Sequence, residues 1–371
     1  MKLKDVIESV NTGLDAIQRA PIVNYDTGIK CLRIGDISQK NNFENWGFSK
    51  VNEENFKKFK LKKNDILIAR TGNTIGVNII IKKDLNSVYN NGLIRLRIKN
   101  KYNPLYIYYL IQSKKFNNYI KSICFGTSTQ PNMKINDLLE FEIPNIELNK
   151  QSKIANILEK LDNKIELNNQ TNDNLLEIAN ELLKKDFKEA YDIEVLSNVI
   201  RFVKGKKPNK ISKFKQENYE KYLTIACLNS QELNYADKDK MLIADNDLLM
   251  VMDGASSGDV YYSDYGIVGS TLARVDITNN QYISEFIYFA LKHYKNLVHS
   301  KNTGSAIPHT DKVFVGTLEV PKINIEQQER YKTLLTKIQK NDQENEILKK
   351  LRDTLLPKLI NGEIDLDKIE I

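Results

Sequence analysis

The chain has 371 residues, enough for two or three domains that each bury a core. Its apolar content of 41% is that of a folded protein, and it has no stretch of about 18 apolar residues, so we expect neither a disordered chain nor a membrane protein. The net charge is +7, and three scattered cysteines lack the spacing of a metal site. Because the first residues also lack the apolar run of a signal peptide, we expect a cytoplasmic protein with buried, reduced cysteines.

The positive charge is concentrated in the first part of the chain. Residues 1–150 contain 24 Lys and Arg against 14 Asp and Glu, whereas residues 191–322 contain 16 of each. A basic balance favours a polyanionic partner, although lysine-rich surfaces are common in proteins that bind no nucleic acid.

Residues 1–145 have the pattern of a mixed α/β body with short strands. We expect buried strands within 30–38, 61–69 and 93–99, and the segment LIRLRIK in the last of these alternates apolar and basic side chains. A tyrosine-rich helix is expected over 104–123, beginning at Pro104. A polar loop, GTSTQPN, follows over 126–132, and a strand ending FEIPN closes this body.

Residues 150–188 have the most regular pattern of the sequence. They contain no Gly or Pro, and every third or fourth residue falls on one strict seven-residue repeat, which is typical of a coiled-coil helix. The alternative is an amphipathic helix that lies on a globular core. The residues of this seam are Ile154, Leu158, Leu161, Ile165, Asn168, Asn172, Leu175, Ala179 and Leu182.

A second copy of this helix pattern favours the coiled coil. It runs over 325–360, and its seam includes Leu335, Ile338, Leu348 and Leu355. Two seamed helices in one chain can bury each other as an antiparallel pair, with the two asparagines of the first seam fixing the register.

The globular part is duplicated as well. Residues 191–322 repeat the order of residues 1–145, with Asp65 matching Asp247, Gly72 matching Gly254 and Arg95 matching Arg274. We therefore expect an α+β protein with pseudo-twofold symmetry. Its parts are two α/β domains, 1–145 and 191–322, each followed by a long helix within 146–190 and 323–371.

Motifs of catalysis are missing from the sequence. The glycine-rich segments GNTIGV and GASSGD lack the Lys of a phosphate-binding loop, and no methyltransferase tetrapeptide is present. Three histidines, His293, His299 and His309, lie in the second copy alone, and we interpret them as solvated or locally hydrogen-bonded rather than as metal ligands.

The remaining candidates are polar loops with the chemistry of DNA recognition. Arg is the usual bidentate partner of guanine and Asn or Gln of adenine, and lysines suit phosphates. Each loop could equally be an ordinary surface turn. In the first copy the candidates are Arg70, Thr71, Asn73, Thr74, Ser128, Thr129, Gln130 and Asn132. In the second copy they are Lys204, Lys206, Lys207, Ser256, Ser257, Ser305 and His309.

The order of two globules and two helices, with the segments QSKIANILEKLDNKIELNNQTNDNLLEIANELLK and LRDTLLPKLINGEID, resembles the DNA-specificity subunit of type I restriction–modification systems. The resemblance covers essentially the whole chain. It implies two target-recognition domains that each read half of a split double-stranded DNA site, with the helix pair as spacer.

The resemblance also implies a non-catalytic chain. Two methyltransferase subunits would dock on it and restriction motor-nuclease subunits would join them; S-adenosylmethionine would bind to the methyltransferase, with no cofactor on this chain. Two alternatives stay open. One is an orphan or phase-variable specificity cassette, and the other is a coiled-coil scaffold whose globules bind protein.

Overall fold

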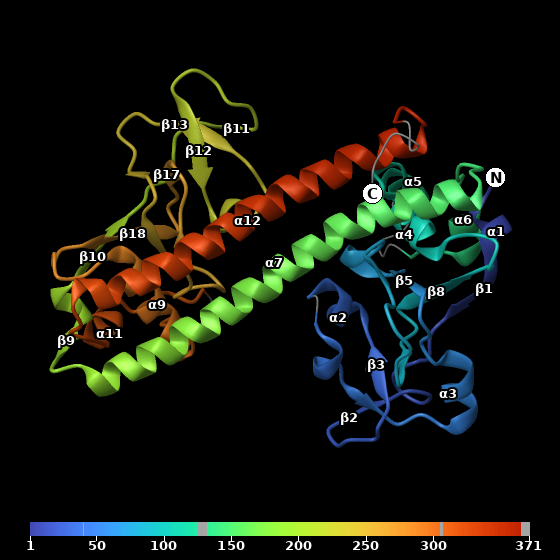
Figure 1. Cartoon of the computed structure of the whole chain (residues 1–371), viewed down its shortest axis with the longest axis horizontal. Helices are drawn as coiled ribbons and strands as arrows, with labels where there is room; N and C mark the ends of the chain where they lie inside the picture. The colour runs from blue at the N-terminus through green and yellow to red at the C-terminus, as the bar shows by residue number, and fades with distance from the viewer. Residues whose placement is uncertain (40, 125–131, 305–306, 365–371) are drawn as a thin grey trace. The chain divides into compact units, whose positions relative to one another are not determined.

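The computed structural model describes residues 1–39, 41–124, 132–304 and 307–364. The chain divides into two compact units (Figure 1). Unit 1 consists of Met1–Glu166 and Asn345–Ile371, and unit 2 consists of Leu167–Glu344. Each long helix contributes one segment to each unit.

Unit 1 is built on two small sheets. The first sheet has the order β1-β8-β5-β6 and is antiparallel throughout; the second has the order β2-β4-β3-β7, in which β3 and β7 run parallel. The strands are β1 Ile7–Thr12, β2 Ile22–Val23, β3 Lys30–Leu32, β4 Phe48–Ser49, β5 Ile66–Ala69, β6 Asn78–Ile80, β7 Ser87–Tyr89 and β8 Leu93–Ile98. The helices before the long one are α1 Leu3–Val6, α2 Ile34–Ser38, α3 Glu53–Phe59, α4 Pro104–Gln112, α5 Lys114–Cys124 and α6 Ile135–Leu139, with short 3-10 turns η1 Phe43–Asn45 and η2 Gly72–Thr74.

Unit 2 repeats this plan. Its sheets have the orders β10-β18-β15-β16 and β11-β13-β12-β17-β14, and a two-stranded ribbon joins β19 to β9. The strands are β9 Ile193–Val195, β10 Ile200–Lys204, β11 Ile211–Ser212, β12 Tyr219–Leu223, β13 Tyr235–Asp237, β14 Ile243–Ala244, β15 Leu248–Val251, β16 Val260–Tyr262, β17 Gly266–Val268, β18 Leu272–Ile277 and β19 Glu319–Pro321. The shorter helical elements are η3 Leu196–Asn198, α8 Ile225–Leu228, α9 Ser284–His293, α10 Lys295–Ser300 and α11 Lys312–Thr317.

The central strands of each first sheet are buried on both faces. In unit 1, alternate residues of β5 and β8 enter different cores: Ile68 and Ile94 pack with the helices, whereas Leu67 and Leu93 pack toward the second sheet. In unit 2, β15 and β18 divide their side chains in the same way. The expected match of Arg95 with Arg274 is confirmed by register, since Arg95 pairs with Leu67 and Arg274 with Leu249.

The long helices are α7 Leu148–Glu189 and α12 Ile325–Ile360, and in each unit their segments run antiparallel. In unit 2, Nδ2 of Asn341 donates to Oδ1 of Asn172 at 2.7 Å, and further along Arg330 reaches Asp186. In unit 1, the guanidinium of Arg352 donates to Asp162 at 2.8 Å. The predicted fold class, tandem α/β bodies with two long antiparallel helices, is therefore confirmed.

Several seam residues pack into the cores of the bodies: Ile154 and Leu158 in unit 1, and Ala179, Leu335 and Ile338 in unit 2. Ile154, Leu158, Asn168, Asn172, Ala179, Leu335 and Ile338 are buried, and Leu161, Ile165, Leu175, Leu182, Leu348 and Leu355 are half-buried. The asparagine positions are hydrogen-bonded rather than empty polar sites: Asn168 donates to Glu344 and Asn172 to Asp342, both at 2.8 Å. Paired polar side chains in an apolar seam penalise a shift of register, because the shift would bury them without partners.

A buried glutamine joins each long helix to its own body. In unit 1, Oε1 of Gln151 accepts from the backbone N–H of Asn103 at 2.9 Å and its Nε2 donates to the carbonyl of Ile146 at 2.7 Å. In unit 2, Gln328 accepts from the N–H of Ile283 at 2.9 Å and donates to the carbonyl of Ile323 at 3.1 Å. The two glutamines are 1% and 0% exposed, so both copies use the same buried link.

One predicted helix is wrong in extent. The stretch expected to be helical over 104–123 is two helices, α4 and α5, separated at Ser113. The Ser113 hydroxyl donates to the carbonyl of Leu110 at 2.6 Å and accepts from the N–H of Phe116. A serine side chain that bonds nearby backbone groups competes with the helical hydrogen bonds, and here it ends one helix and begins the next.

Candidate nucleic-acid interface

The candidate recognition loop of unit 1 joins two distant segments. It contains Arg70–Thr74 after β5 and Asn132 before α6, which meet through a β-bridge between Thr71 and Asn132. The N–H of Met133 donates to the carbonyl of Arg70 at 2.8 Å, which fixes the two backbones together. The turn passes through Gly72 at φ +73°, in open space, a conformation that favours glycine.

Arg70 is oriented by Asn132. Its Nε and Nη2 donate to Oδ1 of Asn132 at 3.3 and 3.1 Å. The guanidinium is half-buried, while Asn73 and Asn132 are exposed. A planar guanidinium held at the surface of a stiff turn has the geometry for bidentate contact with a base or a phosphate.

Unit 2 places a different set of side chains at the matching positions. A β-bridge joins Asp253 to His309, and the N–H of Thr310 donates to the carbonyl of Met252 at 2.9 Å. These contacts correspond to those of Thr71, Asn132 and Arg70, so Met252 occupies the position of Arg70 and His309 that of Asn132. Met252 is 2% exposed, and unit 2 therefore presents no guanidinium at this point.

A charged cluster replaces the guanidinium in unit 2. Asp253 lies 2.8 Å from Nδ1 of His309 through Oδ1 and 2.8 Å from Nζ of Lys204 through Oδ2. Burial acts to raise the pKa of Asp253, but the hydrogen bonds from Lys204 and His309 outweigh it and hold the pKa below its ordinary value. Lys204 and His309 are candidates by residue type, whereas Asp253 is indicated only by its position, which matches Thr71.

Two predicted residues of this loop have different environments. Ser256 is half-buried. Ser257 is 0% exposed, and its Oγ lies 2.6 Å from the carbonyl oxygen of Gly254 and 2.8 Å from that of Pro308. This burial contradicts the predicted DNA contact of Ser257, because its hydroxyl is used to hold the loop.

The other candidates are exposed or half-buried, or they lie outside the residues that the structure describes. Lys206 and Lys207 are exposed, and neither forms an ion pair with the described part of the chain. Thr71 and Thr74 are half-buried at the turn. Ser128, Thr129, Gln130 and Ser305 lie outside the described residues.

The histidines have local polar partners. His293 lies 2.6 Å from Oδ1 of Asn180, His299 lies 2.9 Å from Asp259, and His309 contacts Asp253 as above. Within residues 1–39, 41–124, 132–304 and 307–364, no group of three or more His, Cys, Asp or Glu could hold a metal ion.

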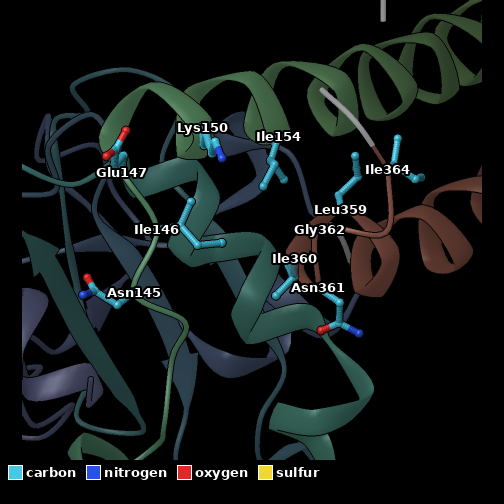
Figure 2. Close-up of a pocket in the computed structure, with 10 residues that line it drawn as sticks. All are labelled: Asn145, Ile146, Glu147, Lys150, Ile154, Leu359, Ile360, Asn361, Gly362 and Ile364. Carbon is cyan, nitrogen blue, oxygen red and sulfur yellow. The ribbon is translucent and has the colours of Figure 1, made fainter. Parts of the chain in front are cut away.

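A hollow of about 490 Å³ lies in unit 1 where α7 begins and α12 ends (Figure 2). Its lining combines apolar side chains with a polar margin and provides no cysteine, serine or histidine as a nucleophile. Ile154 lies in this hollow, three residues after Gln151; in unit 2 the corresponding residue is the larger Tyr331, whose hydroxyl donates to Asp186. The lining residues are Asn145, Ile146, Glu147, Lys150, Ile154, Leu359, Ile360, Asn361, Gly362 and Ile364.

The fold and the loops define a class of protein in which one recognition frame is used twice with different loop chemistry. The sequence matches the family "Type I restriction modification DNA specificity domain" over residues 1–177 and 189–353. The chain belongs to this family. Its predicted function, a DNA-specificity subunit rather than an enzyme, is confirmed by this membership.

Relatives of the chain carry the same description. It is 24% identical over 192 residues to the type I restriction enzyme MjaVIII specificity subunit of Methanocaldococcus jannaschii, covering 47% of this chain and 45% of that protein. It is 26% identical over 337 residues to the MjaIX specificity subunit of the same organism, covering 80% and 76%. The crystal structure of the type I restriction-modification system S subunit from M. genitalium has the same fold, with a TM-score of 0.57, 19% identity and coverage of 97% and 95%. No helix in the described part of the chain could span a membrane.

Proposed function

We propose that this chain reads a bipartite double-stranded DNA target, with residues 1–145 reading one half and residues 191–322 the other. The observation that carries the proposal is the pair of matched loops. Backbone contacts at Arg70 and Asn132 are repeated at Met252 and His309, while the side chains change from a guanidinium and an amide to a thioether and an imidazole. Two copies of one frame with different polar groups suit two different base sequences.

This chain would recognise the DNA sequence, and its partner subunits would carry out the catalysis. Type I restriction–modification systems act on DNA and assemble from several subunits, and we propose that two methyltransferase subunits and the motor-nuclease subunits join this chain. S-adenosylmethionine would bind to the methyltransferase. The long helices would serve as the spacer between the two half-sites.

A domain exchange tests this division of labour. Residues 191–322 are replaced by the corresponding body of another specificity subunit, and the host, which also carries the methyltransferase, is examined by methylation mapping of its genome. We expect one half of the target to change and the other to remain. A target that changes in both halves would contradict the assignment of one half-site to each body.

The absence of cofactor binding on this chain is tested separately. Calorimetric titration of the purified chain with S-adenosylmethionine should give no binding heat, and a mixture with the methyltransferase should give it. Tight binding to the chain alone would show that catalysis is not left to the partner.

A further inference from the structure

A second basic element of unit 2 begins two residues after Lys204, the lysine that pairs with Asp253. Residues 206–215, which we call the basic arm, leave β10 and contain β11. The arm contains five lysines and no acidic residue: Lys206, Lys207, Lys210, Lys213 and Lys215. Four are without an ion pair among the described residues, while Lys215 lies 3.3 Å from Glu220.

The arm is held firmly at its base. At Gly205 a side chain would meet the carbonyl oxygens of Gly269 and Val268 at 2.3 Å, so only glycine allows this close approach. Pro208 is buried. In the middle of the arm Ile211 pairs with Ala236. Figure 1 shows β11, β12 and β13 together at the end of unit 2 that lies away from α9.

The tip of the arm presents an aromatic ring to solvent. Phe214 is 79% exposed, between two exposed lysines, and belongs to none of the hydrophobic clusters of the described residues. Its backbone is nevertheless fixed, since its N–H donates to Oγ of Ser212 at 3.0 Å. A single exposed apolar residue is ordinary, so exposure alone decides nothing.

The same position in unit 1 also carries an exposed aromatic residue. Val23 pairs with Phe48, which pairs with Lys30; in unit 2, Ser212 pairs with Tyr235, which pairs with Lys221. Two residues beyond the matched strands lie Tyr25, 53% exposed, and Phe214. Both copies therefore keep a surface ring at one point of the frame, although the loops around it have diverged.

The charge around the ring is what differs. The corresponding stretch of unit 1, residues 14–26, contains Asp15, Arg19 and Asp26 and no lysine. Arg19 is paired with Asp15 at 2.6 Å, so its charge is already balanced. Phe214 therefore lies among the lysines of its own arm, whereas the loop around Tyr25 contains no lysine.

We propose that the basic arm is a DNA-contacting element of unit 2 in which Phe214 is an apolar wedge against the bases, a role that rests on the proposed function. Lysines around the ring neutralise phosphates on both strands and bring the arm to the groove. The ring packs against a base step and partly unstacks it, as apolar wedges do in bent duplexes. A protein surface is the less suitable partner, because it lacks the dense negative charge that five lysines match.

The test uses the full chain with its methyltransferase partner and the target duplex found by methylation mapping. Adenines of the half-site read by unit 2, other than the one that the methyltransferase modifies, are replaced one at a time by 2-aminopurine, whose fluorescence rises when it unstacks. Wild type should raise the fluorescence at one step. Phe214→Ala should abolish the rise and weaken target binding by roughly tenfold to a hundredfold, whereas Phe214→Leu, which keeps an apolar wedge, should retain most of both.

Matched variants separate the wedge from general effects. Val313→Ala removes another strongly exposed apolar side chain of unit 2, at 81% exposure. It should change neither the fluorescence nor the affinity for the target. Lys213→Gln should weaken binding to target and unrelated DNA alike. It should also reduce the slope of log binding constant against log salt concentration by about one. Tyr25→Ala should leave the fluorescence in the unit 2 half-site unchanged.

The outcomes distinguish the two proposals. If wild type binds its target and Phe214→Ala binds as tightly with the same fluorescence, the wedge is overturned and the proposed function stands. If Phe214→Ala weakens binding to all DNA equally without a fluorescence change, Phe214 does not touch the bases. If wild type binds no duplex even with its partner, the proposed function fails and the wedge fails with it.

Discussion

Units 1 and 2 share a frame and differ in what the frame presents. Both have the same order of central strands and the same buried glutamine, Gln151 or Gln328, between the long helix and the body. They differ at the loops, where the guanidinium of Arg70 in unit 1 is replaced by the cluster of Asp253 and His309 in unit 2. The comparison shows that the buried glutamine link is the same in both units, while surface positions attached to the same backbone contacts differ in chemistry.

The two units also anchor their helix segments with a similar polar group in different places. In unit 2, Asp186 accepts from the hydroxyl of Tyr331 at 2.5 Å and from Arg330 at 2.8 Å. In unit 1, Asp162 accepts from the hydroxyl of Tyr109 at 2.9 Å and from Arg352 at 2.8 Å. The Asp186 side chain is 1% exposed and the Asp162 side chain 27%, so water reaches only the second.

The largest effect is expected from removing these carboxylates. Asp186→Ala should lower the free energy of unfolding by about 3–5 kcal/mol, because it leaves the Arg330 charge and the buried Tyr331 hydroxyl without their partner. Asp162→Ala should cost about 1–2 kcal/mol, since water can replace the lost carboxylate. Urea unfolding followed by circular dichroism measures both. Equal losses would show that burial does not set the difference between these groups.

The shared glutamines should behave alike. Gln151→Ala leaves the N–H of Asn103 and the carbonyl of Ile146 unpaired in the interior, and Gln328→Ala does the same in unit 2, so each should cost about 2–4 kcal/mol. Hydrogen exchange should show lost protection at Asn103 or Ile283, in the mutated unit. Gln343→Ala, on an exposed position of α12, should stay within about 0.5 kcal/mol. A loss in one unit alone would mean that the two frames are not energetically equivalent.

Replacing Arg70 should affect the recognition of one half-site only. If its guanidinium is bidentate to a base, Arg70→Ala should lose about 1–3 kcal/mol of discrimination at one position of the half read by unit 1 and leave the other half unchanged. Asn132→Ala should have a smaller effect in the same direction, because it removes only the group that orients Arg70. Competition binding with single-base variants of the target measures this. Uniform weakening on every sequence would instead assign Arg70 to a phosphate.

The smallest expected effect is a change in the stability of unit 2 at low pH. The folded pKa of Asp253 lies below its ordinary value of 3.8, so its pairing stabilises unit 2 fully above that pH and loses this contribution as the pH falls through the folded pKa. The stability difference between wild type and Asp253→Asn should therefore shrink from pH 5 to pH 3, by less than about 1 kcal/mol. Urea midpoints across this range test the sign; a difference that grows toward low pH would contradict it.

Much of the frame could be predicted because it follows from local pattern. The heptad spacing of Ile154, Leu158 and Leu161 predicts α7, and the repeated loop motifs predict which backbone positions of the two units correspond. The division at Ser113 could not be predicted, because it depends on the Ser113 hydroxyl forming a hydrogen bond with a backbone carbonyl instead of with water.

The candidate site could be described only in part from the sequence. Arg70 and His309 are candidates by residue type, whereas the buried position of Ser257 involves Pro308, 51 positions away, whose carbonyl lies against its hydroxyl. The exposed ring of Phe214 gave no signal in the sequence, since its match to Tyr25 appears only through strand pairing. Contacts between segments far apart in the sequence could not be predicted from the sequence pattern.

The long helices set an order of events during synthesis. The core of unit 1 contains Leu356 and Leu359 of α12, so this core stays incomplete until the last part of the chain leaves the ribosome. Helix α7 ends at Glu189 and α12 begins at Ile325, so 135 residues must be added between them. At roughly 5–20 residues per second, at least about 7–27 seconds pass before synthesis of α12 begins, and the seam of α7 has no partner during this time. Asn168 and Asn172 interrupt its apolar surface during that interval, which makes the nascent helix a poorer template for pairing with another ribosome's chain.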